Sequence, residues 1–163
     1  MSGGKAKKLS SVVVGVDGSA GSNEALDWAI AEARLRHAPL RAVHAWTYVR
    51  QLIPSLVGYP YSAESLDSTV DDRRQAAEQV LGQATGALAD VHEIEIERVI
   101  GEGSAAQVLI GAVGPDDLLV VGSRGHGGFA NLLLGSVSQQ CAHHAPCPVV
   151  IVRGTVASDI HGE

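Results

Sequence analysis

The chain has 163 residues, 45% of them hydrophobic, and a formal net charge of −6, so it can bury one good core and is most simply a single domain. Because its basic residues are few and scattered, apart from lysines near the N-terminus, it lacks the broad positive field of a nucleic-acid-binding protein. No apolar run approaches the length of a membrane span and the N-terminus lacks the apolar centre of a secretory signal, so we expect a cytoplasmic protein with no nucleic-acid or membrane partner.

The first third of the chain predicts two parallel strands joined by a helix. Residues 9–17 form an apolar run that ends in an acid, which is typical of a central strand buried on both faces. Apolar residues then recur at helical spacing over residues 21–37, until Pro39 ends the pattern. Residues 40–46 restore an extended, mostly apolar run, so this part of the chain predicts a right-handed crossover.

The same alternation continues through the rest of the chain. Residues 47–65 show no clean period, which predicts a long irregular loop, and helical composition follows over residues 63–89. A third strand is expected to begin near His92. The later elements are expected as a helix at 104–113, a strand at 118–121, a helix at 136–144 and a strand at 148–153. Strict alternation predicts an α/β fold with a doubly wound parallel sheet and helices on both faces.

Two side-chain pairs near the C-terminus give weak chemical signals. Cys141 and Cys147 have a C-x5-C spacing that matches neither a redox pair nor a zinc framework, so we interpret them as small core or surface thiols. His143 and His144 are adjacent on the expected last helix and point in different directions. A zinc site is therefore not expected.

A glycine-rich loop separates the expected strand at 118–121 from the last helix. Gly122, Gly125, Gly135 and Ser136 follow the pattern G-x2-G-x9-G-S. Glycines let backbone N–H groups approach an anion closely, and the N-terminal end of the following helix is positive. We expect Gly122 and Gly125 to leave room for phosphates in this way. A turn that binds nothing is the alternative interpretation, but a three-part spacing after a strand is less easily explained by chance.

This pattern resembles the nucleotide-binding signature of the ATP-binding subgroup of the universal stress protein family. The opening Val-Gly-Val-Asp-Gly-Ser and the closing Pro-Cys-Pro-Val-Val-Ile-Val also match the family. The resemblance covers residues 9–153, leaving residues 1–8 as a disordered basic arm and residues 154–163 as a flexible tail. It implies a Rossmann-like sheet of five strands in the order 3-2-1-4-5, so that strands one and four meet where the winding reverses. Ligands of such sheets bind at this switch point.

The resemblance implies an adenine-nucleotide site at the ends of strands one and four. Asp17 could accept hydrogen bonds from ribose hydroxyls or hold a metal ion near phosphates, although a turn aspartate is the alternative. Arg124 and His126 could supply positive charge, or they could face solvent. ATP with Mg or Mn is the expected ligand, and cyclic AMP is the alternative. The predicted cofactor-binding residues are Gly15, Val16, Asp17, Ala45, Val121, Gly122, Arg124, Gly125, Gly135, Ser136 and Val137, with Asp17 as the predicted metal ligand.

The sequence does not predict a fast enzyme. The P-loop pattern G-x4-G-K-[ST] is absent and no lysine occurs between Val121 and Val152, so we expect at most slow ATP hydrolysis. The G-x-S-x-G motif of serine hydrolases is absent as well. The resemblance implies a sensor or regulator that forms a homodimer through its apolar last strand. An ATP-dependent enzyme of the same fold and a nucleotide-free interaction module are the rival hypotheses.

Overall fold

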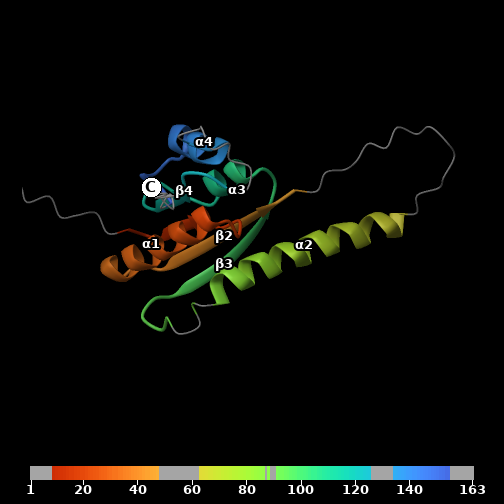
Figure 1. Cartoon of the computed structure of the whole chain (residues 1–163), viewed down its shortest axis with the longest axis horizontal. Coiled ribbons are helices and arrows are strands. Elements are labelled where there is room, and N and C mark those ends of the chain that lie inside the picture. Colours follow the sequence, from red (N-terminus) through yellow and green to blue (C-terminus); the bar gives the residue numbers. More distant parts are fainter. Residues whose placement is uncertain (1–8, 48–62, 87, 89–90, 126–133, 155–163) are drawn as a thin grey trace, which may run out of the picture.

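The computed structural model describes residues 9–47, 63–86, 88, 91–125 and 134–154. The predicted arm at 1–8, the tail from 155 and most of the predicted loop, at 48–62, lie outside the described residues. Figure 1 shows strands and helices in alternation along the chain. They are β1 (Val12–Gly15), α1 (Ala20–Arg36), β2 (Leu40–Trp46), α2 (Ala63–Gly86), β3 (Ile96–Glu102), α3 (Ala105–Gly111), β4 (Leu118–Gly122), α4 (Ser136–His144) and β5 (Val149–Val152).

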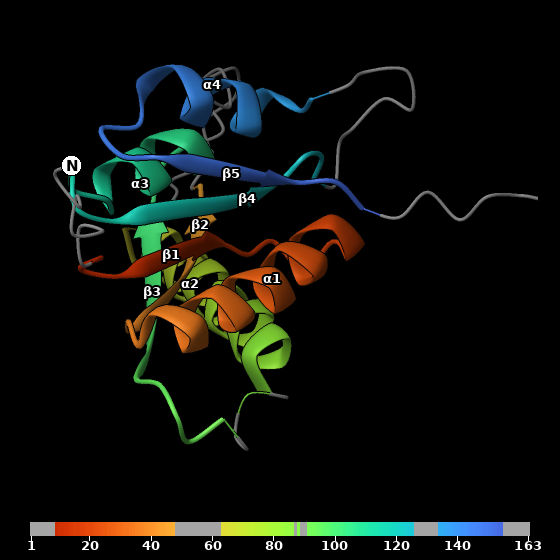
Figure 2. The same cartoon turned by 90° about the vertical axis from the view of Figure 1, so that its left-hand side faces the viewer.

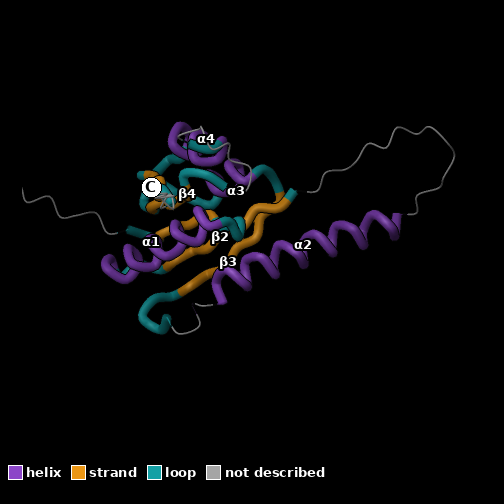
Figure 3. The backbone as a smooth tube through the Cα atoms, in the orientation of Figure 1, coloured by secondary structure: helices purple, strands orange, loops and turns teal. Residues whose placement is uncertain are grey.

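The strands form one parallel sheet in the order β3-β2-β1-β4-β5. Helices α1 and α2 cover one face of this sheet, and α3 and α4 cover the other (Figure 2). Helix α2 runs alongside β2 and β3, and its N-terminal end extends past them (Figure 3). The predicted fold class and strand order are therefore confirmed. No helix in the described part of the chain is both long and apolar enough to span a membrane.

Strand β1 is the centre of two hydrophobic cores. Its first three valines are fully buried: Val12 and Val14 pack beneath α1 and α2, whereas Val13 packs toward α3 and α4. Successive side chains of a strand point to opposite faces, so a run of valines supplies both cores at once. This is why an uninterrupted apolar segment predicted a central strand.

Some element boundaries differ from the predictions. Strand β3 begins at Ile96 and not near His92, because its neighbour β2 begins only at Leu40, directly opposite Ile96. Residues 63–65, which lay in both the predicted loop and the predicted helix, belong to α2, so this helix begins where its predicted segment began. Helices α2 and α3 end at Gly86 and Gly111, slightly earlier than expected.

The two cysteines are free thiols at the α4 side of the sheet. Cys141 is fully buried, and this burial raises its pKa to about 11. Cys147 is partly buried, and burial raises its pKa as well. A thiol in apolar surroundings stays protonated and behaves as a small hydrophobic group. The interpretation of Cys141 as a core thiol is confirmed.

A buried polar contact joins the beginnings of β1 and β4. The Ser11 hydroxyl donates to Asp117 Oδ1 at 2.8 Å, and the Gly114 N–H donates to Asp117 Oδ2 at 2.8 Å. Ser11 and Asp117 are only 5% and 8% exposed. The Leu118 N–H donates in turn to the Ser11 carbonyl at 3.0 Å. These bonds hold the two central strands together at the end of the sheet opposite their carboxyl ends.

We expect Ser11→Ala to lower the free energy of unfolding by about 1–3 kcal/mol, because it leaves a buried carboxylate oxygen without its hydroxyl donor. Urea denaturation followed by circular dichroism measures this change. The exposed neighbour Ser10 provides the control, and Ser10→Ala should stay within about 0.5 kcal/mol of the wild type. Equal stability of the two variants would show that the contact with Asp117 contributes little.

Candidate functional site

A cavity of about 400 Å³ lies at the carboxyl ends of the central strands. Strands β1 and β4 are neighbours, but β1 leads to α1 on one face and the chain after β4 leads to α4 on the other. A crevice opens between chains that leave a sheet in opposite directions. The described residues that line it are Gly15, Val16, Asp17, Ser22, Val43, Ala45, Ala105, Leu109, Val121, Gly122, Arg124, Gly125, Gly135, Ser136, Val137 and Ser138.

All eleven residues predicted for the site line this cavity. They come from four separate parts of the chain that only the sheet topology brings together. Their binding role stays a prediction, and His126, the other cation considered, lies outside the described residues.

Sequence reasoning missed five lining residues. Val43 lies two residues before Ala45 on β2, so strand alternation could have placed it on the same face. Ala105 and Leu109 are one turn apart on α3, which packs over this part of the sheet. The remaining two, Ser22 and Ser138, lie in the first turns of α1 and α4, where serine is read more simply as a helix-capping residue.

The cavity has a mostly apolar wall and a polar end. The side chains of Val16, Val43 and Leu109 are buried or nearly so and offer no hydrogen-bonding groups. Among the described lining residues, Asp17 and Arg124 are the two that carry charge. A cavity with apolar walls and a few polar groups is the usual form of a site for a small organic ligand.

Asp17 organises the turn that follows β1. Its Oδ1 accepts hydrogen bonds from the Ser19 N–H at 2.9 Å and the Ser19 hydroxyl at 2.6 Å. Ser19 in turn caps α1, because its hydroxyl accepts from the Ser22 N–H at 3.2 Å. The left-handed φ of 81° at Gly18 allows the chain to reverse between them. The turn role considered for Asp17 is therefore present, and it coexists with a place in the cavity wall.

The described residues suit a metal ion that binds together with a ligand better than one that the protein binds by itself. No cluster of three or more histidine, cysteine or acidic side chains with metal-binding geometry occurs in the described ranges. Asp17 is the one described lining residue that carries a carboxylate. Mg²⁺ is commonly bound by one or two carboxylates together with phosphate oxygens and water. Asp17 could complete such a shell only if a phosphorylated ligand supplied the other oxygens.

No described side chain caps the beginning of α4. Gly135 is its N-cap residue and offers no side chain, whereas the hydroxyls of Ser19 and Ser104 cap α1 and α3. The Ser138 hydroxyl instead donates to backbone carbonyls, those of Ser123 at 3.1 Å and Gly135 at 2.9 Å, and so fixes the helix start. The first N–H groups of a helix point out of its N-terminal end and carry partial positive charge. The N-terminal end of α4 forms part of the cavity wall, and this position suits the binding of an anion.

Two of the three glycines of the predicted motif, Gly122 and Gly125, are required by space and not by an unusual backbone angle. Among the described glycines, positive φ occurs at Gly18 and Gly103. A Cβ on Gly122 would lie 2.8 Å from the Gly21 carbonyl oxygen, and one on Gly125 would lie 2.6 Å from Asp17 Oδ2. At Gly135 the nearest atoms would be 3.5 Å away, an ordinary contact.

This geometry corrects the reason given for Gly122 and Gly125. They were expected to leave room for phosphates, but the space beside Gly122 is filled by the backbone at the start of α1. Gly125 makes room for the carboxylate of Asp17. The two glycines therefore shape the cavity by allowing close packing of the protein on itself.

The fold and this cavity define a doubly wound α/β domain with a ligand-sized crevice at its switch point. Residues 9–153 match the Universal stress protein family, and the chain belongs to this family. It is 36% identical over 143 residues to a universal stress protein of Mycolicibacterium smegmatis, covering 88% of this chain and 48% of that protein. It is also 32% identical over 164 residues to one from Mycobacterium tuberculosis, covering 99% and 56%. The chain thus spans about half the length of these curated relatives.

Solved structures show the same architecture. The universal stress protein UspA from Lactobacillus plantarum superposes with a TM-score of 0.71 at 21% identity, covering 91% of this chain and 100% of that one. A universal stress protein crystallised in complex with cAMP gives a TM-score of 0.64 at 27% identity, covering 91% and 99%.

We expect Gly122→Ala to lower the free energy of unfolding by about 1–3 kcal/mol, because its Cβ would overlap backbone atoms that cannot rotate away. Gly82 in α2 is the matched control, since a Cβ there meets nothing within 4 Å. Gly82→Ala should raise stability by about 0.5–1 kcal/mol through its effect on the unfolded chain. Denaturant unfolding of both variants measures the contrast, and a Gly122→Ala protein as stable as the wild type would contradict the packing argument.

Proposed function

We propose that this chain is a cytoplasmic, adenine-nucleotide-binding universal stress protein that acts as a nucleotide-gated sensor or regulator. ATP, with Mg or Mn, is the proposed ligand, and cyclic AMP is the alternative. The observation that carries the proposal is the beginning of α4, which no described side chain caps and which lines the cavity together with Arg124.

The polar end of the cavity suits phosphate groups. Arg124 supplies a positive charge in a chain whose net charge is −6, and α4 contributes the partial charge of its first turn. Ser136, in that turn, adds a hydroxyl. Charge-assisted hydrogen bonds from such donors are the stronger class of hydrogen bond, so they favour an anion over a neutral ligand.

The apolar wall suits a flat heterocycle. Val16, Val43 and Leu109 provide contact area, and the neighbouring Ala45 offers backbone groups at the end of β2 that can pair with a base edge. Asp17 also lines the cavity and can accept hydrogen bonds from ribose hydroxyls. The complex of the 27% identical universal stress protein with cAMP supports an adenine nucleotide as the ligand class.

A nucleotide in this position would join segments that the chain keeps apart. The turn after β1, the loop after β4 and the start of α4 all line the cavity. A ligand that contacts all three segments binds the protein more tightly when they lie together than when they are apart. A regulator requires such a difference in affinity between two conformations.

Isothermal titration calorimetry with ATP, ATP plus magnesium, and cyclic AMP tests the ligand, and Gly135→Ser tests the site. Serine suits the φ of −77° and ψ of 167° at this N-cap, and its hydroxyl would accept the hydrogen bonds that the proposal assigns to phosphate. We expect wild-type protein to bind, and Gly135→Ser to bind at least about tenfold more weakly with stability unchanged or slightly higher.

Gly82→Ala serves as the control for binding, because its Cβ lies in open space on α2. It should bind nucleotide as the wild type does. If Gly135→Ser bound nucleotide as tightly as the wild type, the phosphates would not be bound at the beginning of α4. If the wild type bound neither ATP nor cyclic AMP, the proposed function would be overturned. A preference for cyclic AMP over ATP would select the alternative ligand.

We also propose that two copies associate through β5. This strand lies at the edge of the sheet and pairs with β4 alone among the described strands. All four of its residues are partly buried, with Val150 and Val152 toward one core and Val149 and Ile151 toward the other. An apolar edge strand invites pairing with a further strand, and a second copy of the same edge provides a closed, symmetric partner.

Sedimentation equilibrium over a range of protein concentrations tests this association. We expect a mass twice that of the 16.9 kDa chain, because pairing covers the exposed edge of β5. A monomer mass throughout the concentration range would contradict the proposal.

A further inference from the structure

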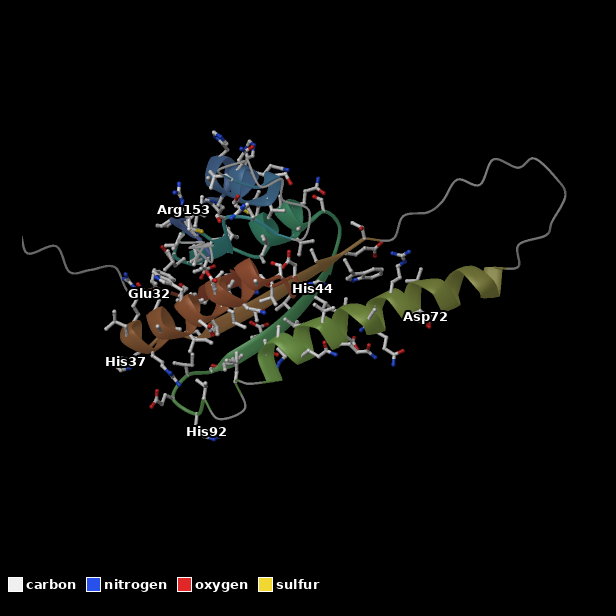
Figure 4. All side chains as sticks on the ribbon, in the orientation of Figure 1. Glu32, His37, His44, Asp72, His92 and Arg153 are labelled. Carbon is white, nitrogen blue, oxygen red and sulfur yellow. The ribbon has the colours of Figure 1, made fainter. Side chains whose placement is uncertain are left out.

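His44 makes a contact that the proposed binding site does not yet account for. Its Nδ1 lies 2.6 Å from the backbone carbonyl oxygen of Val16. Figure 4 shows His44 on β2, toward α2, and the alternation along the strand places it on the same face as Ala42. The side chain is partly buried, and it extends from β2 to Val16, the residue that follows β1.

This contact occurs where the pairing of β1 with β2 ends. The register between the two strands stops at Gly15, opposite Val43, and the Val16 N–H makes a last ladder bond to the Val43 carbonyl at 2.9 Å. The Val16 carbonyl accepts a hydrogen bond from the His44 side chain of β2, and not from the backbone of that strand. The chain is then able to leave the sheet and enter the turn that begins with Asp17.

The peptide unit between Val16 and Asp17 is held at both ends. Its carbonyl accepts from His44, and its N–H donates to the Ser22 hydroxyl at 3.3 Å. Ser22 is only 5% exposed, and its hydroxyl also donates to the Ser19 carbonyl at 3.0 Å. One peptide plane is therefore fixed from β2 on one side and from α1 on the other.

We infer that His44 is a positioning residue for nucleotide binding, which acts by fixing the orientation of the Val16–Asp17 peptide. This inference rests on the proposed function. Val16 and Asp17 line the cavity on either side of this peptide, one in its apolar wall and one at its polar end. Rotation of the peptide plane moves both of them, so a donor that fixes the carbonyl fixes the spacing between the two parts of the site.

The contact also defines the tautomer of His44. A carbonyl oxygen can only accept a hydrogen bond, so Nδ1 must carry the hydrogen. In the neutral ring, Nε2 is then the nitrogen without a hydrogen. This assignment can be tested on the free protein, without any nucleotide.

Two substitutions separate the hydrogen bond from the shape of the side chain. In His44→Asn the amide nitrogen is bonded directly to Cγ, as Nδ1 is, so it can donate to the same carbonyl. In His44→Leu the branch at Cγ is kept but the donor is lost. We expect His44→Leu to bind ATP or cyclic AMP about tenfold more weakly, and His44→Asn to recover most of the affinity. Calorimetry at a temperature where urea titrations show all three proteins fully folded separates binding from stability.

Long-range ¹H–¹⁵N correlation spectra of the histidine rings give the second measurement. We expect the Nδ1–H tautomer at His44, assigned by the loss of its signals in His44→Asn. An Nε2–H tautomer would overturn the inference, as would equal affinities of the wild type and His44→Leu for a nucleotide that the wild type binds. Wild-type protein that binds neither ATP nor cyclic AMP would overturn the proposed function itself, and the positioning role with it.

Discussion

The parallel pairing of β1 with β4 is the constraint on which the rest of this molecule depends. Val12, Val13 and Val14 lie opposite Leu118, Leu119 and Val120, and both strands are buried from both faces. The chain leaves β1 toward one face and β4 toward the other, so these neighbours cannot be covered by a common helix at their carboxyl ends. The cavity is a consequence of that divergence and not of any single side chain.

Close backbone packing gives this opening its shape. The hypothetical Cβ of Gly21 would lie 2.7 Å from the Arg124 carbonyl oxygen, and that of Gly122 would lie 2.8 Å from the Gly21 carbonyl oxygen. Helix α1 thus begins in contact with the backbone that follows β4. Larger residues at these positions would separate the helix from the loop, because neither backbone can move without disturbing a strand or a helix start.

The sequence predicted the fold and much of the cavity wall for different reasons. Buried parallel strands produce apolar runs that are recognisable in the sequence, and the spacing of Gly122, Gly125 and Gly135 drew attention to the edge of the sheet where the cavity lies. Local patterns could not reveal why Gly122 is glycine, since the atoms that exclude a Cβ belong to Gly21, far away in the chain. The same limit applies to His44 and Val16, whose contact joins residues 28 positions apart.

The helix starts around the cavity differ in a way that follows from their neighbours. Ser19 and Ser104 complete the first turns of α1 and α3 from within the chain, so those helices need no external acceptor. Gly135 has no side chain that could cap the first turn of α4. The Ser138 hydroxyl fixes the same turn by hydrogen bonds to the carbonyls of Ser123 and Gly135. A helix start that is held in place but not capped costs stability unless another acceptor is present. A phosphorylated ligand would supply that acceptor, and this makes α4 the element whose stability nucleotide binding would change most directly.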